Sequence, residues 1–374
     1  MRILITGTNG FIGKNIRLRF GEVEEWELLS FTRDNGLDEL PSLVARADAV
    51  IHLAGVNRAA DPAEMFKGNK GLTDALCDSI DQAAAAGHRP LLIHASSIQA
   101  RLDNDYGRSK LAAEKRVSAC IAAHGLNGYI FRLPNVFGKW CRQEYNSVVA
   151  TFCYNIARGL PVRIENPDKL LKLIYVDDLV DTFMHVLQGL APTRDDDGFA
   201  LVMPVYQATV QELADSIRGF RKGRQTLLVD RVGAGLTRAL YSTYLTYLDP
   251  ADFDYPITCH RDQRGIFAEM LRTRDSGQIS FFTAGPGVTR GGHYHHSKAE
   301  KFLVISGRAR FKFRHMQSGE YRELITDGCD LRIVDTVPGW THDITNIGDS
   351  EMFVMLWANE QFDPNRPDTF SCPV

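Results

Sequence analysis

Two side chains four residues apart, Tyr106 and Lys110, have the types and spacing for proton transfer to a carbonyl group. In a helix this spacing places the phenol and the ammonium group on one face. The nearby ammonium ion favours the phenolate, which makes the phenol a competent proton donor when a ketone becomes an alcohol. Ser97 ends an apolar run shortly before them, where its hydroxyl can bond the carbonyl oxygen, and Ser96 suits a structural role. Tyrosine–lysine pairs also occur by chance on helix surfaces, so the surrounding motifs must show whether this pair is catalytic.

A glycine-rich turn follows the first apolar run of the chain. Glycines three residues apart permit a tight turn and close backbone approach, and the following helix offers free N–H groups to a diphosphate. The motif requires a strand before it and a helix after it, and the sequence supplies both. We therefore expect a dinucleotide site formed by Gly7, Asn9, Gly10, Phe11, Ile12 and Gly13.

The end of the second apolar run predicts which dinucleotide binds. Sites that prefer NAD usually place an acidic residue there to bind the ribose 2′-hydroxyl. Here Thr32 occupies that place and Arg33 follows it. A guanidinium group is a planar, bidentate partner for a 2′-phosphate, so we expect NADPH. The alternative is that Arg33 is merely exposed and that Asp34 binds the ribose of NADH.

Four residues near the C-terminus have the types and spacing of metal ligands: His293, His295, Glu300 and His342. The two stretches that carry them resemble the two motifs of cupin β-barrels. Three imidazoles and one carboxylate suit Zn²⁺, Fe²⁺, Mn²⁺ or Ni²⁺, and the sequence does not distinguish these ions. We expect one zinc ion per chain, because the chemistry inferred below needs a Lewis acid and no redox step.

The elements expected around these residues divide the chain in two. In the first half, strand-like runs alternate with helical stretches, which predicts an α/β fold with a Rossmann-type, doubly wound parallel sheet. The expected strands span residues 2–6, 27–31, 49–53, 91–95 and 129–133, and the main helices span 66–86 and 106–124. From about Gly265 the runs are short and β-rich, at 278–283, 301–313 and 351–357, as in an all-β sandwich or barrel. The resemblance to cupins implies a jelly-roll barrel. We place the domains at residues 1–252 and 253–374, because prolines interrupt regular structure near that boundary.

Composition narrows the functional class. The net charge of −3 gives no basic footprint for nucleic acid. No apolar run approaches the ~20 residues of a membrane helix, and Met1 leads straight into a strand-like run, so we expect neither a membrane segment nor a signal peptide. Seven cysteines without a CxxC pair suggest reduced thiols in a cytoplasmic protein. Cys141 and Cys153 are nucleophile candidates, but buried inert thiols are the simpler interpretation.

About 250 residues at the start resemble an extended short-chain dehydrogenase/reductase. The resemblance is carried by the glycine motif, Leu53-Ala54-Gly55, Asn69, Ser97, Tyr106 with Lys110, Arg132 to Gly138 and Tyr175 to Asp178. It implies that the tyrosine and the lysine are catalytic, together with Ser97 and Asn69. It also implies that Leu53, Ala54 and Gly55 line the cofactor site, that the lysine holds the nicotinamide ribose, and that sugar nucleotides are substrates.

The substrate side departs from that family at one place. By the resemblance, Asn135 contacts the substrate, and relatives often carry Arg-Asp just before a strand that follows. Here that place holds Leu171 and Lys172. Lys172, Lys169 or Arg238 is a candidate to replace the arginine on the substrate phosphate, and all three are also compatible with solvated surface positions.

The pairing of a reductase with a metal cupin resembles the CapF-like enzymes of capsular polysaccharide synthesis, from Gly7 to Phe370. It implies a UDP-4-keto-6-deoxy-N-acetylhexosamine as substrate and two consecutive reactions. The cupin first inverts C3, whose proton is acidified by the C4 carbonyl. The reductase domain then reduces C4 to give UDP-2-acetamido-2,6-dideoxy-L-talose, toward UDP-N-acetyl-L-fucosamine. Because exposed barrel edges often pair with a second copy, we also expect a homodimer through the cupin.

The base that removes the C3 proton is not assigned. On a strand, Tyr294 and His296 would face away from His293 and His295, and Lys301 is one candidate. Two alternatives to the bifunctional enzyme remain. One is a simple NADPH-dependent ketoreductase whose zinc cupin is structural and dimerising. The other is a non-catalytic, NADPH-binding regulator, which would have no need of the proton donor Tyr106.

Overall fold

The computed structural model describes residues 1–374 except 60, 258, 263–264, 269–270, 274–277 and 361–364. The chain forms two compact units, and each is built from two stretches of sequence. The first unit comprises residues 1–142 and 171–207, and the second comprises 143–170 and 208–374. The predicted division into domains at residues 1–252 and 253–374 stays a prediction. No helix in the described ranges is both long and apolar enough to span a membrane.

The first unit contains a five-stranded sheet in the order β2-β1-β3-β4-β5, in which every neighbouring pair is parallel. Its strands are β1 (Arg2–Thr6), β2 (Glu27–Phe31), β3 (Ala49–His52), β4 (Leu91–Ser97) and β5 (Gly128–Leu133). The five strands predicted from the apolar runs are therefore confirmed, the first two to the residue. The strand order reverses between β1 and β3, and in open sheets ligands bind at the carboxyl ends of strands at such a point.

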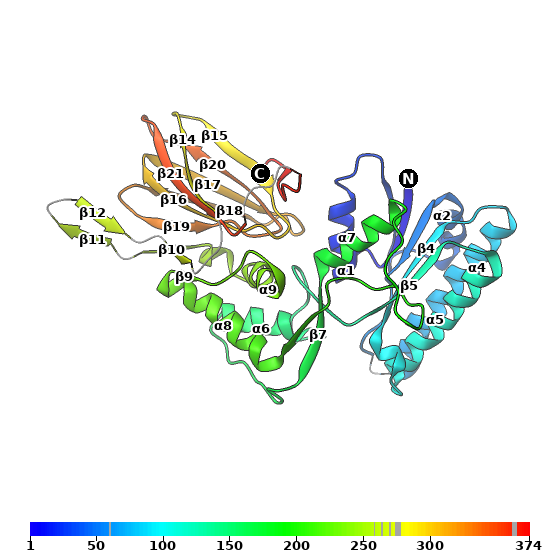
Figure 1. The fold of residues 1–374 in the computed structure, drawn as a ribbon. Helices are drawn as coiled ribbons and strands as arrows, with labels where there is room; N and C mark the ends of the chain where they lie inside the picture. The colour runs from blue at the N-terminus through cyan, green and yellow to red at the C-terminus, as the bar shows by residue number, and fades with distance from the viewer. Residues whose placement is uncertain (60, 258, 263–264, 269–270, 274–277, 361–364) are drawn as a thin grey trace. The chain divides into compact units, whose positions relative to one another are not determined.

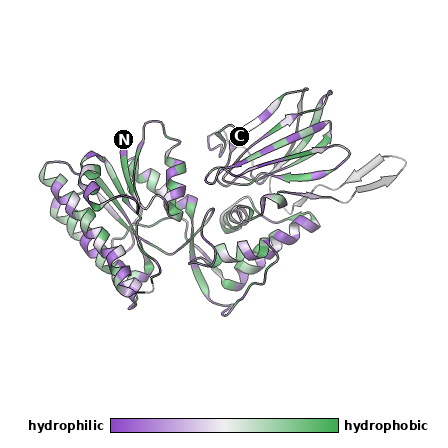
Figure 2. Cartoon of the chain, turned by 180° about the vertical axis from the view of Figure 1, so that it is seen from behind, coloured by the Kyte–Doolittle hydropathy of each residue, from purple (hydrophilic) through white to green (hydrophobic). Residues whose placement is uncertain are grey.

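Helices cover both faces of this sheet (Figure 1). On one face α2 (Leu40–Arg46), α4 (Leu72–Ala85) and α5 (Asp105–His124) enclose a core that includes Leu4, Leu76 and Val117. On the other lie α1 (Phe11–Phe20) and α7 (Val176–Leu187), where the Phe131 and Phe183 ring centroids are 5.0 Å apart. In Figure 2 the strands are mostly green and the helices carry both colours, as expected for a sheet buried on both faces. The predicted Rossmann-type fold is confirmed.

The helix that carries Tyr106 and Lys110 has well-defined ends. The Asn104 side chain accepts a hydrogen bond from the Gly107 N–H at 2.8 Å and caps the first turn of α5. Gly125 ends the helix with a φ of 58°, a conformation that glycine adopts without a steric penalty. The cap therefore fixes Tyr106 in the first turn and Lys110 one turn later.

The helix predicted over residues 66–86 is interrupted. It consists of α3 (Pro62–Phe66), a π-helical segment (Lys67–Gly71) and α4. A π-helical turn adds a residue to the turn and changes the direction of its side chains. Asn69 lies in this segment, and the segment aims its amide at two neighbouring elements, as described below.

Among the described residues, the second unit combines three α-helices with two five-stranded antiparallel sheets. The helices are α6 (Val148–Ala157), α8 (Val210–Thr226) and α9 (Gly235–Leu245). One sheet has the order β10-β19-β16-β21-β14, formed by Asp254–Pro256, Arg332–Asp335, Glu300–Ser306, Met352–Ala358 and Gln278–Ala284. The other has the order β18-β17-β20-β15-β22, formed by Tyr321–Asp327, Arg308–His315, Trp340–Asn346, Thr289–Tyr294 and Phe370–Ser371. The predicted β-rich C-terminal region is confirmed.

The predicted strand run 301–313 is two strands. Gly307 separates β16 from β17 with a φ of 89°, and a Cβ atom there would lie 2.8 Å from the Cα of Met352. Only glycine fits this turn. The remaining strands are short: β6 (Asn135–Phe137), β7 (Leu170–Tyr175), β8 (Tyr206–Thr209), β9 (Leu228–Val229), β11 (Cys259–Asp262), β12 (Gly265–Ala268) and β13 (Arg272–Thr273).

Candidate active site and metal centre

The glycine-rich turn lies at the point where the strand order reverses. Gly7 has a φ of 78°, and a Cβ atom on it would lie 3.0 Å from the Cα and N atoms of Ala54. A Cβ atom on Gly13 would lie 2.3 Å from the carbonyl oxygen of Gly7. The turn therefore packs directly on the loop after β3, and glycine is required on both sides of it.

The other predicted dinucleotide-site residues surround this contact. Asn9 and Gly10 are exposed, Gly10 is the N-cap of α1, and Phe11 and Ile12 begin the helix. Leu53, Ala54 and Gly55 form the loop after β3, in which Gly55 is exposed. The structure thus brings the glycine turn, the start of a helix and the β3 loop together at the carboxyl edge of the sheet, where the amide groups of the helix suit a diphosphate.

The turn after β2 carries the residues expected to choose the cofactor. Thr32 bonds within this turn, since its N–H donates to the Asn35 side chain at 2.8 Å and its hydroxyl donates to Asp34 at 3.3 Å. Asp34 is therefore engaged with Thr32, whereas Arg33 is exposed beside it. A guanidinium group on this edge of the sheet is available to a 2′-phosphate.

The predicted proton-transfer residues come from β4 and α5. Lys110 is 6% exposed and its Nζ donates to the main-chain oxygen of Ala95 at 3.0 Å. Burial lowers the pKa of Lys110 to about 8, and the Glu114 carboxylate partly opposes this effect. Ser97 ends β4, where its hydroxyl accepts a hydrogen bond from the Gln99 N–H at 3.2 Å. Tyr106 is partly buried in the first turn of α5.

Ser96 has the structural role expected of it. Its hydroxyl donates to Glu114 Oε1 at 2.6 Å, and Glu114 also forms an ion pair with Arg132 at 2.7 Å. The Arg132 guanidinium stacks on the Phe199 ring, 3.6 Å from its centroid. This buried network ties β4, α5 and β5 together below the edge of the sheet that carries Ser97.

Asn69 joins the β3 loop to α5, the helix that carries Tyr106 and Lys110. Its side-chain oxygen accepts from the Val56 N–H at 2.8 Å, and its amide group donates to the Val56 oxygen and to the Ser109 hydroxyl, both at 2.9 Å. Ser109 directly precedes Lys110. The amide group of Asn69 is thus bonded to the loop after β3 and to α5 next to Lys110, and its catalytic role stays a prediction.

His52 was not singled out from the sequence, and the structure places it in a buried hydrogen-bond network with Thr6 and Thr73. The Thr6 hydroxyl accepts hydrogen bonds from the Leu53 and Ala54 N–H groups, both at 3.2 Å, so its own proton goes to His52 Nδ1 at 2.7 Å. His52 Nε2 then donates to Thr73 Oγ1 at 2.9 Å. Burial lowers the pKa of His52 to about 3, with a smaller effect from Lys110, so the ring is neutral.

This chain of bonds continues to the π-helical segment that contains Asn69. The Thr73 hydroxyl donates to the main-chain oxygen of Asn69 at 2.7 Å. His52 therefore connects the strand before the glycine turn to Asn69. Sequence spacing gave no signal for it, because the partners of His52 lie 46 and 21 residues away.

The residues predicted to contact the substrate belong to both units of the chain. Asn135 on β6 donates to the main-chain oxygen of Lys172 on β7 at 3.1 Å, and both side chains are exposed in the first unit. Arg238 lies on α9 in the second unit, where it bonds to Ser297 Oγ and lies 3.6 Å from Glu360 Oε2. Arg238 is thus engaged with the β-rich region, and its role as a phosphate ligand stays a prediction.

The four predicted metal ligands meet in the second unit. Ligand atoms of His293, His295, Glu300 and His342 all lie within 4.8 Å of one another. The imidazoles come from β15, the turn after it and β20, and Glu300 begins β16. Glu300 Oε2 lies 3.1 Å from His295 Nε2 and 3.6 Å from His342 Nε2.

The chemistry of this cluster fits a divalent metal ion. The two ring nitrogens of His342 are buried and have no hydrogen-bond partner among the described residues. Burial raises the pKa of Glu300, but His295, His342 and Lys298 outweigh it and hold that pKa well below its usual range, so the carboxylate is ionised. A buried carboxylate among imidazoles with unused lone pairs is a donor set of the kind that Zn²⁺ prefers.

The residues beside the ligands face away from them, as the strand pattern predicts, and they are buried. β15 ends at Tyr294, and Tyr294 and His296 are both buried. Their rings pack on Phe370, with centroids 5.6 and 5.0 Å away. They therefore face away from the ligands, as predicted, but into the C-terminal segment of the chain.

Lys301 is not suited to remove a proton. Its Nζ lies 2.6 Å from Asp335 Oδ1 and donates to the Tyr255 hydroxyl at 3.0 Å. Burial lowers the pKa of Lys301, but Asp335 outweighs burial and raises it above its ordinary value. The amine is therefore protonated at neutral pH and cannot act as a base.

Two parts of the chain match known protein families. Residues 3–196 match the NAD dependent epimerase/dehydratase family, and residues 260–370 match the polysaccharide biosynthesis C-terminal domain. A UDP-2-acetamido-2,6-beta-L-arabino-hexul-4-ose reductase of Pseudomonas aeruginosa is 52% identical over 375 residues, which cover 100% of this chain and 99% of the relative.

Two solved structures are similar to this chain. The crystal structure of the capsular polysaccharide assembling protein CapF from Staphylococcus aureus is 40% identical and covers 100% of both chains with a TM-score of 0.69. A UDP-glucuronic acid 4-epimerase from Bacillus cereus, 16% identical, covers 59% of this chain and 84% of its own with a TM-score of 0.50, and shares the fold. The resemblance to CapF-like proteins is thereby confirmed. The chain belongs to the NAD dependent epimerase/dehydratase family and carries a polysaccharide biosynthesis C-terminal domain.

Proposed function

We propose that the first unit reduces the C4 ketone of a UDP-4-keto-6-deoxy-N-acetylhexosamine with NADPH. The observation that carries this proposal is the buried Lys110 one turn after Tyr106, beside Ser97 at the carboxyl edge of the sheet. The full-length relative named as a UDP-hexulose reductase supports the substrate class. The exposed Arg33 after β2 supports NADPH over NADH.

Each residue of the proposed site has its own role in the reduction. When bound at the glycine-rich turn, NADPH would be the source of the hydride for C4. Tyr106 donates its phenolic proton to the ketone oxygen, and solvent later returns that proton to the phenolate, so the product is an alcohol. The Lys110 ammonium stabilises the phenolate, and the Ser97 hydroxyl bonds the ketone oxygen.

We further propose that the β-rich region is a metal-binding cupin that epimerises C3 of the same substrate. His293, His295, Glu300 and His342 hold the ion, for which zinc is our first choice. A bound divalent ion acts as a Lewis acid toward an oxygen next to the acidic carbon. The C3 proton is acidic only while C4 is a ketone, so epimerisation precedes reduction and the product is UDP-2-acetamido-2,6-dideoxy-L-talose. That product suits a pathway to UDP-N-acetyl-L-fucosamine for capsule or O-antigen.

The β-rich region also has a surface suited to a homodimer. β14 is an edge strand, and its alternate residues Ile279 and Phe281 are 59% and 73% exposed. Unpaired backbone groups together with exposed apolar side chains favour pairing with a second copy.

One experiment tests both reactions. The UDP-keto-sugar is incubated with enzyme in D₂O, with and without NADPH, and followed by NMR. We expect deuterium at C3 without NADPH, and a C4 alcohol after NADPH is added. Reduction without C3 exchange would instead support a ketoreductase with a structural metal, and the absence of both would contradict the proposal.

A further inference from the structure

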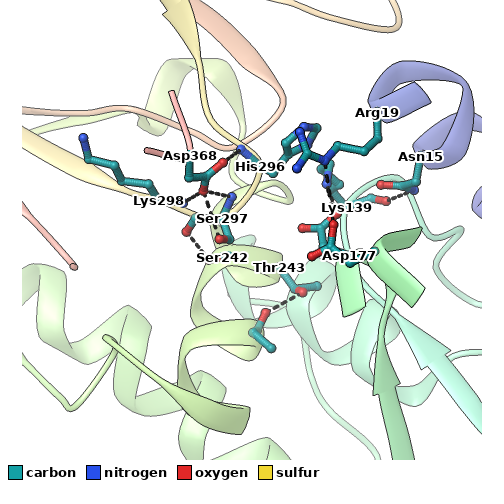
Figure 3. Close-up of polar contacts among 12 residues, drawn as sticks. Asn15, Arg19, Lys139, Asp177, Ser242, Thr243, His296, Ser297, Lys298 and Asp368 are labelled. Atoms are coloured by element: carbon teal, nitrogen blue, oxygen red, sulfur yellow. Dashed lines mark hydrogen bonds and ion pairs between the residues drawn. The ribbon is translucent and has the colours of Figure 1, made fainter. Parts of the chain in front are cut away.

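The turn that links two of the proposed metal ligands is held by the C-terminal segment of the chain. His295 and Glu300 are separated by residues 296–299, and the segment that holds this turn spans residues 365–374. Figure 3 shows Asp368 of that segment beside His296, Ser297 and Lys298, with dashed lines to the turn. Metal geometry depends on how such a turn places the two ligands.

The Asp368 carboxylate bonds the backbone of this turn. Oδ1 accepts from the His296 N–H at 2.9 Å. Oδ2 accepts from the N–H groups of Ser297 and Lys298 at 2.9 and 2.7 Å, and from the Ser297 hydroxyl at 3.0 Å. One carboxylate therefore satisfies three successive N–H groups, and bonds of this kind to an ionised acceptor are stronger than neutral ones.

The main chain of Asp368 acts directly on a ligand. Its carbonyl oxygen lies 2.6 Å from His295 Nδ1. Because a carbonyl oxygen only accepts, Nδ1 carries a proton there, and Nε2, which lies 3.1 Å from Glu300 Oε2, is the nitrogen that a bound metal ion would contact. Metal-bound histidines commonly bond a carbonyl or carboxylate through their other nitrogen in this way.

The backbone at Asp368 is unusual, and its surroundings hold it. Its φ is 27°, a conformation that non-glycine residues rarely adopt. The residues after it are fixed on β15 and β17: Phe370 and Ser371 pair with Tyr294 and His293, Cys372 N–H donates to Gly292, and Arg314 donates to Pro373. Strain that is held in place beside a site indicates a role there.

The opposite side of the turn is anchored separately. The Ser242 hydroxyl of α9 donates to the Ser297 oxygen at 2.6 Å, and Asn359 accepts from the Ala299 N–H at 2.9 Å. These bonds reach main-chain groups of the turn, whereas the segment 365–374 also bonds a ligand ring. Asp368 is thus the residue that couples the turn to His295.

We propose that Asp368 is a positioning residue of the metal centre, which orients His295 through its carbonyl oxygen and sets the spacing from His295 to Glu300 through its carboxylate. The inference rests on the proposed metal-binding function. It predicts that loss of the carboxylate weakens metal binding although all four ligands remain. Partners of this kind change metal affinity by about 10–100-fold.

The test measures zinc affinity, not activity. Full-length protein is freed of metal with a chelator and titrated with Zn²⁺ against a chromophoric competitor, as wild type, Asp368→Asn, Ser297→Ala and the control Asp349→Asn. Asp349 lies exposed in the turn after β20. We expect Asp368→Asn to bind zinc about 10–100-fold more weakly, because its amide N–H₂ meets backbone donors. Ser297→Ala should be weakened less, and Asp349→Asn should match the wild type.

The possible outcomes distinguish a wrong role for Asp368 from a wrong assignment of the metal site. Wild-type protein that binds no zinc would contradict the proposed metal site. Zinc-binding wild type with equal affinity in a folded Asp368→Asn variant would overturn the role of Asp368. Circular dichroism of the metal-free proteins checks folding. If Asp368→Asn does not fold, Ser297→Ala decides, and wild-type affinity in that variant overturns the inference.

Discussion

Lys110 on α5 donates from Nζ to the main-chain oxygen of Ala95 on β4 at 3.0 Å. Ala95 lies two residues before Ser97, so this bond fixes the ammonium group relative to the end of the strand. Burial, with Lys110 6% exposed, disfavours the charge and lowers its pKa to about 8. The proposed reductase site therefore contains an ammonium ion that the fold holds at a cost in stability.

Replacing this lysine should stabilise the fold. The folded pKa of Lys110 is about 8 and the ordinary value is 10.5, so between these pH values the unfolded chain binds a proton that the folded chain has lost. Wild-type stability should therefore rise from pH 8 to pH 10.5. Below pH 8 the folded chain bears the full penalty, and Lys110→Met should raise the free energy of unfolding at pH 7 by up to about 3 kcal/mol.

Urea denaturation at pH 7 and pH 10.5 checks this prediction. The advantage of Lys110→Met should shrink at the higher pH, while its ketone reduction is lost at both. A variant less stable than the wild type at pH 7 would show that the bond to Ala95 outweighs the cost of burial.

The neighbouring serines provide a matched pair. Ser97→Ala removes the hydroxyl proposed to bond the ketone oxygen and should lower kcat by about 100-fold. It also removes the bond to the Gln99 N–H, which should cost about 1 kcal/mol of stability. Ser96→Ala removes the buried bond to Glu114 and should cost about 1 kcal/mol of stability with kcat nearly unchanged. Steady-state kinetics and thermal unfolding measure both, and equal kcat values in the two variants would contradict the role of Ser97.

Cofactor choice should depend on Arg33. Arg33→Asp should raise the KM for NADPH by about tenfold or more and lower the KM for NADH, because it replaces a phosphate ligand by an acid. The control is Arg46→Asp, since Arg46 pairs with Glu27 at the other end of β2. An unchanged preference in Arg33→Asp would leave Asp34 as the ribose contact.

Two glycines should respond oppositely to alanine. Gly13→Ala places Cβ 2.3 Å from the Gly7 oxygen and should destabilise the chain by about 1–3 kcal/mol, with loss of cofactor binding. A Cβ atom on Gly219, within α8, would meet no atom within 4 Å outside its own helical backbone among the described residues. Gly219→Ala should therefore stabilise the chain by about 0.5–1 kcal/mol. Thermal unfolding and cofactor titration compare the two variants.

The proposed homodimer should depend on the β14 edge. Phe281 is 73% exposed, and Phe281→Asp should shift the protein from dimer to monomer because a buried carboxylate in an apolar interface is costly. Light scattering measures the mass, with Tyr321→Asp, an exposed residue on edge strand β18, as the control. Wild-type protein that is already monomeric would contradict the proposed dimer.

Some features could be predicted because they are local. The glycine spacing, the four-residue step from Tyr106 to Lys110 and the alternation of strands with helices follow from backbone geometry over a few residues. The spacing from His293 to Glu300 is local in the same sense. The interrupted helix at Asn69 could not be predicted, because its π-helical segment is favoured by bonds to Val56 and Ser109.

The two fold types and the residues proposed for each site could be predicted from the sequence, because apolar periodicity and motif spacing are properties of neighbouring residues. What those side chains can do depends on contacts that form only when the chain folds. Asp335 keeps Lys301 protonated, the Thr6–His52–Thr73 chain steadies Asn69, and Asp368 reaches His295 across 73 residues. Contacts between distant segments have no fixed spacing along the chain, and the burial that shifts a pKa exists only after folding.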